Sequence, residues 1–214
     1  SGAFGGVIRR TAGTLNVTKT GGGTQILGGA NRYNGATAVN GGVLALEGSN
    51  TLSGTVTVDA GATLRLGHPR ALGGAPLIVA AGGAAFDTAG MAESCLLADA
   101  QTLRLDINGA VSAATLATAP GNGLALTGTA ALHVNGYGGA APALTAAGGG
   151  GVTLSAGNAV TVTVPGTTPL PAGDHVLIGG GTDGTAPSAV AVNGAGRAAG
   201  TTATLAIEGG DLIL

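Results

Sequence analysis

The chain reads GGVLALEGSNTLSGTVTVDAGATLRLGHPRALGGAPLIVAAGGAAF over residues 41–86, and large apolar residues return in this stretch at a fixed interval. Leu46, Leu66 and Phe86 are equally spaced along the chain. Short alternating segments that are separated by glycine turns and repeat at an interval of roughly 20 residues are typical of a solenoid in which each turn is one repeat. Because a solenoid is held together by contacts between neighbouring turns, this stretch predicts a rod or a fibre.

Apolar residues alternate with polar or small residues along almost the entire chain, as at Val56 and Val58 or at Leu103 and Leu105. This is the pattern of half-buried β-strands. Clusters of Gly and Asn separate the segments and supply the positive φ that tight corners need. Evenly spaced strands also suit a β-sandwich, but a sandwich has no reason to repeat its sequence pattern at a fixed interval. We therefore predict an all-β fold, a parallel β-helix (β-solenoid) with rungs of roughly 20 residues.

A single elongated β-solenoid domain over residues 1–214 is the expected organisation. Residues 1–106 carry regular repeats, whereas the period blurs in residues 107–214, where we expect less regular rungs or a sandwich-like end. About ten turns at a strand spacing of about 4.8 Å would make a rod roughly 50 Å long. The best helical signal lies in Met91–Ala100, where one or two turns of helix or a loop are both compatible with the sequence.

The composition excludes several classes of protein. Charged residues make up 8% of the chain and the formal net charge is −2, which excludes a nucleic-acid-binding surface of clustered Lys and Arg. Glycine accounts for 44 residues, but the apolar content of 44% is more than a disordered chain has to bury. The sequence has no apolar run long enough for a transmembrane helix, and the lone Cys95 cannot form an internal disulfide.

An active site on a β-helix would need ionisable side chains that converge. Cleavage of sugars uses two carboxylates that are a few ångströms apart. The densest acidic run contains Asp87, Glu93, Asp99 and Asp106, and Arg104 lies two positions before the last of them. A solvated face with a weak ion pair between Arg104 and Asp106 explains these residues better than catalysis does.

The three histidines, His68, His133 and His175, are isolated and lack the spacing of metal ligands. His133 is expected to point outward. The glycine-rich segment 179–184 superficially resembles a calcium-binding nonapeptide, but its repeat does not recur, which favours a plain loop. We therefore predict no catalytic residue, no cofactor and no metal site, so the protein is not expected to be an enzyme.

Two kinds of residue are expected to shape the interior. Large apolar residues at similar phases of the repeat should stack as one inward core ladder: Leu46, Leu66, Phe86, Leu105 and Leu126. Ala45 should face outward. Asparagines at the corners should stack rung on rung and satisfy backbone groups: Asn31, Asn34, Asn40 and Asn50.

The ends of a solenoid expose unpaired strands and core side chains unless a polar cap covers them. Here both ends are apolar and are predicted to be assembly ends: Phe4, Val7 and Ile8 at the start, and Leu212, Ile213 and Leu214 at the finish. A head-to-tail contact that does not close into a ring propagates as a filament. We expect a head-to-tail homopolymer, and adjoining modules of a longer chain that act as caps are the alternative.

Residues 13–46 resemble the autotransporter-associated β-strand repeat, and weaker similarity runs to about residue 90. The positions that carry the resemblance are Lys19, Gly21, Gly23, Thr24, Asn31, Tyr33, Gly35 and Thr37. Gln25 departs from the pattern, since an aliphatic residue is usual there. The resemblance implies a right-handed β-helix that a bacterium exports to its surface or to the extracellular space, and it does not imply an enzyme.

The leading hypothesis is an exported bacterial structural protein, a β-solenoid subunit of an extracellular fibre or surface stalk that assembles end to end. The first alternative is an adhesin or binding module that recognises a surface glycan or a host or cell partner. The second is a β-helix enzyme that acts on polysaccharide. Aromatic residues are only 2% of the chain, which counts against both glycan readings because sugar rings stack on Trp and Tyr.

Overall fold

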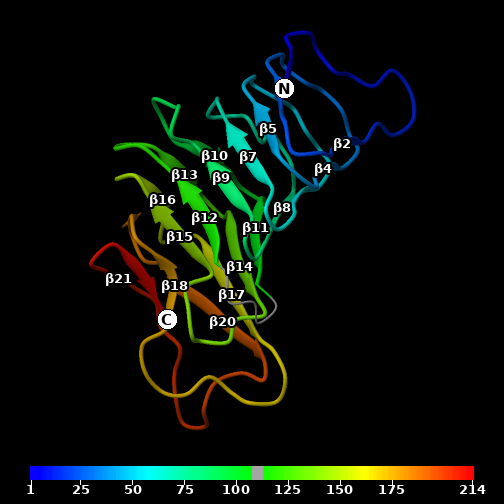
Figure 1. Cartoon of the computed structure of the whole chain (residues 1–214). Coiled ribbons are helices and arrows are strands. Elements are labelled where there is room, and N and C mark those ends of the chain that lie inside the picture. The colour runs from blue at the N-terminus through cyan, green and yellow to red at the C-terminus, as the bar shows by residue number, and fades with distance from the viewer. Residues whose placement is uncertain (108–112) are drawn as a thin grey trace.

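Figure 1 shows the computed structural model of the chain, which describes residues 1–107 and 113–214. Within these residues every regular element is a β-strand, and the strands stack along one axis, from the N-terminal end at the top of the view to the C-terminal end at the bottom. The described part of the chain contains no helix that is long and apolar enough to cross a membrane.

The strands form three sheets, named here by their strand number. The ten-stranded sheet has the order β1 (Gly2–Phe4), β3 (Thr24–Leu27), β5 (Val43–Leu46), β7 (Thr63–Leu66), β9 (Ala85–Asp87), β12 (Ala114–Ala117), β15 (Leu144–Ala147), β18 (Val176–Gly179), β22 (Asp211–Ile213) and β21 (Ala206–Glu208). The eight-stranded sheet has the order β2 (Val17–Lys19), β4 (Thr37–Val39), β6 (Val56–Val58), β8 (Leu77–Ala81), β11 (Thr102–Asp106), β14 (Ala131–Asn135), β17 (Ala159–Val164) and β20 (Ala189–Gly194). The four-stranded sheet has the order β10 (Cys95–Leu97), β13 (Gly123–Leu126), β16 (Gly151–Leu154) and β19 (Thr182–Gly184).

Consecutive strands of the chain lie in different sheets, and each strand pairs with the strand one turn later. Up to β9 the chain alternates between the ten-stranded and eight-stranded sheets, and from β10 on it visits all three sheets in each turn. The pairing is parallel in every turn of the stack, from β1 with β3 to β17 with β20. The molecule is therefore a β-solenoid, as the alternation and the period predict.

The turns lengthen along the rod. In the eight-stranded sheet Thr37 pairs with Val56. Further on, Leu103 pairs with Leu132, so the turn there is about half as long again. The predicted rung of roughly 20 residues is thus confirmed for the first turns, and the added residues of the later turns build the four-stranded sheet. Because the later turns are longer, the chain completes fewer of them than predicted, and the eight-stranded sheet holds 8 strands rather than about ten.

The predicted core ladder is wrong as a single row, although all five of its residues are buried. Leu46 pairs with Leu66, but Phe86 pairs with Leu64. The cause is that the turn from Leu64 to Phe86 is two positions longer than the turn before it, so the aromatic ring moves two positions along the strand and still faces inward. The other two residues of the predicted ladder lie in the other sheets: Leu105 in β11 and Leu126 in β13.

Ala45 faces outward as expected, but it is not exposed. It alternates with the inward Leu44 and Leu46, as predicted, but it is completely buried. Its neighbours on the same face are Ile26 on one side and Arg65 on the other. A methyl group between two longer side chains loses its contact with water, so an outward position on this sheet is not always an exposed one.

The C-terminal part continues the solenoid rather than forming a sandwich. Its last feature is an antiparallel hairpin of β21 and β22, which pairs β22 with β18 and extends the ten-stranded sheet. The segment Met91–Ala100, for which a helix was one possibility, contains β10. Its Cys95 and Leu97 are buried and Leu96 between them is exposed, which is the alternation of a strand.

Candidate functional site

The outer face of the eight-stranded sheet carries a polar cluster on three consecutive turns. On β11 Arg104 forms an ion pair with Asp106, and Asn135 of β14 donates an amide hydrogen bond to the second oxygen of Asp106 at 2.8 Å. His133 Nε2 lies 3.0 Å from the Thr163 hydroxyl of β17. Partial burial and the neighbouring Arg104 lower the pKa of His133, so the ring is neutral near pH 7. One carboxylate and one neutral imidazole, each already hydrogen-bonded, form a cross-strand ladder.

The other acidic candidates do not join this cluster. Asp87 ends β9 in the ten-stranded sheet and accepts a hydrogen bond from the backbone of Ala89. Glu93 is exposed ahead of β10. Asp99 follows β10 in the four-stranded sheet, where the backbone N–H and the hydroxyl of Thr129 bind its carboxylate and lower its pKa. The predicted acidic run is therefore spread over different faces of the rod.

The histidines are also apart from one another. His68 accepts a hydrogen bond from the backbone of Arg70 in a corner. His175 lies near the C-terminal end, where its ring meets Tyr137 edge-on and Nε2 lies 3.0 Å from the Pro171 carbonyl. Among residues 1–107 and 113–214, no three His, Cys, Asp or Glu side chains gather closely enough to hold a metal ion.

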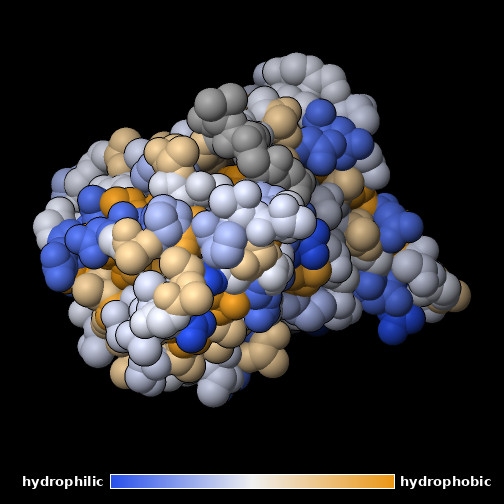
Figure 2. Space-filling model, turned by 90° about the horizontal axis from the view of Figure 1, so that it is seen from below, coloured by the Kyte–Doolittle hydropathy of each residue, from blue (hydrophilic) through white to orange (hydrophobic). Residues whose placement is uncertain are grey.

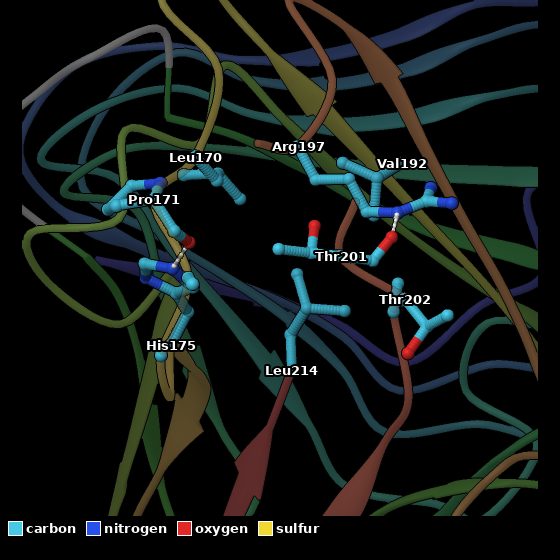
Figure 3. A pocket seen from close by; sticks show the side chains of 11 residues that line it. Leu170, Pro171, His175, Val192, Arg197, Thr201, Thr202 and Leu214 are labelled. Carbon is cyan, nitrogen blue, oxygen red and sulfur yellow. Dashed lines mark hydrogen bonds between the residues drawn. The ribbon is translucent and has the colours of Figure 1, made fainter. Parts of the chain in front are cut away.

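A hollow of about 230 Å³ lies between the C-terminal loops (Figure 3). Leu170, Val192 and Leu214 supply apolar walls, and the guanidinium of Arg197 is held at the rim because its Nε donates to the Thr201 carbonyl. Ligand pockets generally measure about 300–1,000 Å³. The hollow is smaller, and its cation already has a partner, so it is best described as a gap beneath the loops.

The corners of the solenoid hold buried amides that link one turn to the next. Asn31 Nδ2 donates to Asn50 Oδ1 at 3.0 Å, and the Asn31 backbone N–H donates to the same oxygen at 2.9 Å. Asn50 in turn donates to the Ala71 carbonyl, while Asn31 Oδ1 accepts from the Ile8 backbone. Four successive turns are thereby joined through two side chains, as the corner-stacking prediction requires.

The remaining corner asparagines behave differently from one another. Asn34 contacts the preceding turn, where its side chain accepts from Leu15 N, whereas Asn40 is exposed. In the longer turns the linking amides were not predicted: Gln101, Asn122 and Asn158. Each accepts a hydrogen bond from the backbone N–H three residues earlier and donates to a carbonyl of the preceding turn. The recurring dipeptide Gly-Asn at 121–122 and 157–158 is the signal in the sequence that marks two of them.

Substitution of Asn50 by Ala should destabilise the protein by about 1–3 kcal/mol, because the buried Asn31 amide and backbone N–H lose a shared acceptor and the Ala71 carbonyl loses the amide that donates to it. Urea unfolding followed by circular dichroism measures this loss. The matched control is Asn40→Ala, since Asn40 is exposed and should change stability by less than about 0.5 kcal/mol. Equal stabilities of the two variants would contradict the linking role of Asn50.

The segment that contains the corner residues Asn31 and Asn50 also matches a known protein family. Residues 17–46 and 44–66 match the model of the passenger-associated-transport-repeat. Residues 17–66 are therefore similar to this repeat, and they make up less than half of the chain. The comparisons with curated proteins and with solved structures found no match. The resemblance noted from residues 13–46 is therefore confirmed over this segment, which spans β2 to β7.

The polar residues of the transport repeats have structural roles. Lys19 Nζ donates to three backbone carbonyls, those of Thr20, Gly21 and Gly41, so the ammonium holds two consecutive glycine corners together. Tyr33 and Thr37 are buried, and their hydroxyl oxygens are 2.7 Å apart. The Lys19 ammonium and the Tyr33 and Thr37 hydroxyls therefore form hydrogen bonds within the protein.

Glycines of the transport repeats and their neighbours allow the turns to approach closely. A Cβ on Gly35 would lie 2.3 Å from the Leu15 carbonyl oxygen. Gly21 has a φ of +72°, which favours glycine for a separate reason. Gly23 and Thr24 lead from this corner into β3.

The two predicted assembly ends differ from each other. At the N-terminal end Phe4 is 46% exposed and Val7 is 49% exposed, while Ile8 is half-buried. At the C-terminal end Leu212 is fully buried in the hairpin. Leu214 exchanges two backbone hydrogen bonds with His175, each of 2.9 Å. The expectation that residues 212–214 form a free apolar end is wrong, because β18 of the same chain already binds this segment.

Proposed function

We propose that this protein is the structural rod of an exported bacterial passenger, a β-solenoid that serves at the cell surface as a stalk or as the subunit of an extracellular fibre. The observation that carries the proposal is the unbroken parallel stack from β2 to β20. Such a stack buries one continuous core along its length, so it is stiff and resists local opening. The transport repeats in residues 17–66 support export as a passenger.

The rod is proposed to act without chemistry of its own. The polar side chains Asn31, Asn50 and Asn135 form hydrogen bonds that link one turn to the next. The acidic residues Asp87 and Asp106 lie on different sheets of the rod. Such a rod is proposed to act as a spacer, which holds whatever it carries at a fixed distance from the cell surface. Single-particle imaging of the purified protein tests this directly, because it distinguishes a rod from a globule.

Two observations favour a spacer over a glycan-binding adhesin. Tyr33, Phe86 and Tyr137 are buried, which leaves Phe4 as the single exposed aromatic ring of the chain. Burial raises the pKa of the Tyr137 hydroxyl to about 12, and this group donates to the Val176 carbonyl. A lateral face without aromatic platforms is poorly suited to stacking on sugar rings. Binding of the purified rod to several unrelated glycans on an array would contradict the spacer.

Loss of the ion pair between Arg104 and Asp106 should leave the function intact. Asp106→Asn takes away the ion pair with Arg104, which is partly exposed, and is expected to cost no more than about 1 kcal/mol. Thermal unfolding and display of the passenger on the cell surface are the measurements. Loss of display in a variant that unfolds at the same temperature as the wild type would show that Asp106 has a role beyond structure.

A further inference from the structure

We propose that a groove on the side of the rod binds a short, extended acidic segment of a partner protein, whose carboxylate pairs with Arg70 and whose aliphatic side chain packs on Leu96. This inference goes beyond the spacer function, because it adds a docking point to the rod. The groove is here named the step groove. It lies between the corner segments 50–53 and 70–74 of the last two short turns and four residues of the first two long turns: Leu96, Ala98, Gln101 and Thr127.

The step groove follows from the change in the outline of the turns, and further turns lie on both sides of it along the rod. A short turn passes directly from the ten-stranded to the eight-stranded sheet, whereas a long turn inserts a strand of the four-stranded sheet between them. β10 is the first of these inserted strands, so it lies beside a corner that has no strand to pair with it. The hollow at this step measures about 460 Å³, within the range of about 300–1,000 Å³ that is usual for ligand sites.

The step groove crosses four consecutive turns. The Asn50 amide donates to the Ala71 carbonyl in the next turn, and the Gln101 amide donates back to the Ala75 carbonyl. Thr127 lies one turn beyond Gln101. Strands of neighbouring turns are about 4.8 Å apart, so four turns span about 14 Å. An extended chain advances about 3.4 Å per residue, and a segment of about four residues therefore matches the groove in length.

Arg70 supplies a fixed cation to the step groove. Its backbone N–H donates to His68 Nδ1, and its carbonyl accepts from the N–H groups of Asn50 and Gly73. Its side chain is exposed, and the ion pairs in the part of the chain that the structure describes are formed by other arginines. A guanidinium binds a carboxylate through two parallel hydrogen bonds, so an acidic side chain is a suitable partner for Arg70.

Leu96 supplies the apolar contact of the step groove. It is a large aliphatic residue, yet it is 41% exposed on the outer face of β10. The positions that pair with it in successive later turns are small or polar: Ala125, Thr153 and Asp183. In this row of the four described strands, a large apolar side chain therefore occurs only at the groove. An aliphatic side chain of a bound segment would cover it.

The walls of the step groove are already ordered. Asn50 and Gln101 are buried, and their amides are bonded to neighbouring turns. A site with ordered walls loses less conformational entropy on binding than a mobile one. The exposed hydroxyls of Thr51 and Ser53 line the same groove and can bond to the backbone of a bound segment.

The lining of the step groove favours a peptide over other ligands. The groove has no aromatic platform for a sugar ring among its lining residues. A single guanidinium is too little for nucleic acid or an anionic membrane, which are bound by clusters of Lys and Arg. On the face of the rod that Figure 2 shows, hydrophobic residues lie in small areas between hydrophilic ones. That face does not provide the broad apolar interface of a stable dimer.

Binding to a peptide array tests the proposal. The labelled protein is applied to all tetrapeptides composed of Asp, Glu, Leu and Val, each acetylated and amidated at its ends, and to their Asn and Gln counterparts. We expect peptides that combine acidic and aliphatic residues to bind, and their amide counterparts to bind about tenfold more weakly. Arg70→Gln and Leu96→Ala should each weaken the best peptide by about fivefold to tenfold, measured by fluorescence anisotropy. Both side chains are exposed, so thermal unfolding should not change.

Two matched controls should bind like the wild type. Arg10→Gln removes an exposed arginine outside the groove, and Thr153→Ala shortens an exposed side chain two turns beyond Leu96 in the same row. An array without binding, equal binding of acidic and amide peptides, or an unchanged affinity of Arg70→Gln overturns the proposal. Sedimentation of the protein alone tests a second copy as the occupant, and a dimer that Arg70→Gln dissociates also overturns it. Each of these results leaves the spacer function standing, because imaging of the rod involves no ligand.

Discussion

Leu66→Asp should destabilise the solenoid by about 3–5 kcal/mol, the cost of an uncompensated buried charge. Leu66 is 1% exposed and pairs with Leu46 in the adjacent turn. A carboxylate at this position has no basic partner in the core row, which consists of apolar residues. Because whole domains are stable by about 5–15 kcal/mol, the loss is a large part of the total. Urea unfolding of the purified variant gives the free energy.

The control for Leu66→Asp is Thr145→Asp, which introduces the same group on the outside of the same sheet. Thr145 is exposed and pairs with Thr115 on the outward face. Its substitution is expected to change stability by about 0.5 kcal/mol or less. Ala45→Asp is a poor control because Ala45 is fully buried. If the Leu66 and Thr145 variants unfold at the same urea concentration, the inward assignment of Leu66 is wrong.

Gly151→Ala should destabilise the second half of the rod by about 3 kcal/mol or more, beyond the usual cost of a single overpacked methyl group. A Cβ at Gly151 would lie 1.6 Å from the carbonyl oxygen of Gly181 and 2.3 Å from its carbonyl carbon. Since these are backbone atoms of the next turn, the clash can be relieved only if two turns separate. Separation breaks the pairing of β16 with β19, where Val152 donates to Gly181.

Gly90→Ala is the matched control for Gly151→Ala. Gly90 has no positive φ, and a Cβ built there meets no atom within 4 Å. Restriction of the unfolded chain should then leave stability unchanged or raise it by about 0.4–1 kcal/mol. Hydrogen exchange adds a spatial test, because Gly151→Ala should lower the protection of β16 and β19 and spare the transport repeats. Uniform loss of protection along the rod would contradict a local clash.

Period and alternation are sufficient to predict the class of fold, because both follow directly from strand geometry. They are not sufficient to predict the row in which a residue stacks. The turn that ends at Phe86 is two positions longer than the turn that ends at Leu64, and a shift of two positions preserves the inward direction. Alternation cannot detect such a shift, so the equal spacing placed Phe86 beside Leu66 instead of Leu64.

Neither the period nor the alternation of apolar residues predicted that the later turns are longer. The four-stranded sheet begins with the short strand Cys95–Leu97, a pattern too brief to distinguish a strand from a loop. Corner amides could be predicted where Asn31 and Asn50 repeat at the turn length. The later amides share one geometry but lie in turns of another length, so the interval of roughly 20 residues did not point to them. The hairpin of β21 and β22 was missed because an apolar C-terminal strand reads the same whether its partner is internal or another molecule. The right hand of the helix and the assembly of the subunits stay predictions.

The unequal turns also bear on how such a rod can change its length during evolution. A short turn, such as the one from Leu44 to Leu64, can be duplicated or deleted as a cassette because the turns on either side have a similar outline. A long turn has a different outline, because it includes a strand of the four-stranded sheet. The turn from Phe86 to Leu116 is half as long again, so it is the junction between the two outlines: a short turn precedes it and a turn of its own length follows it. Turns should therefore be gained or lost mainly on the N-terminal side of that junction. The junction turn itself should occur once in each molecule.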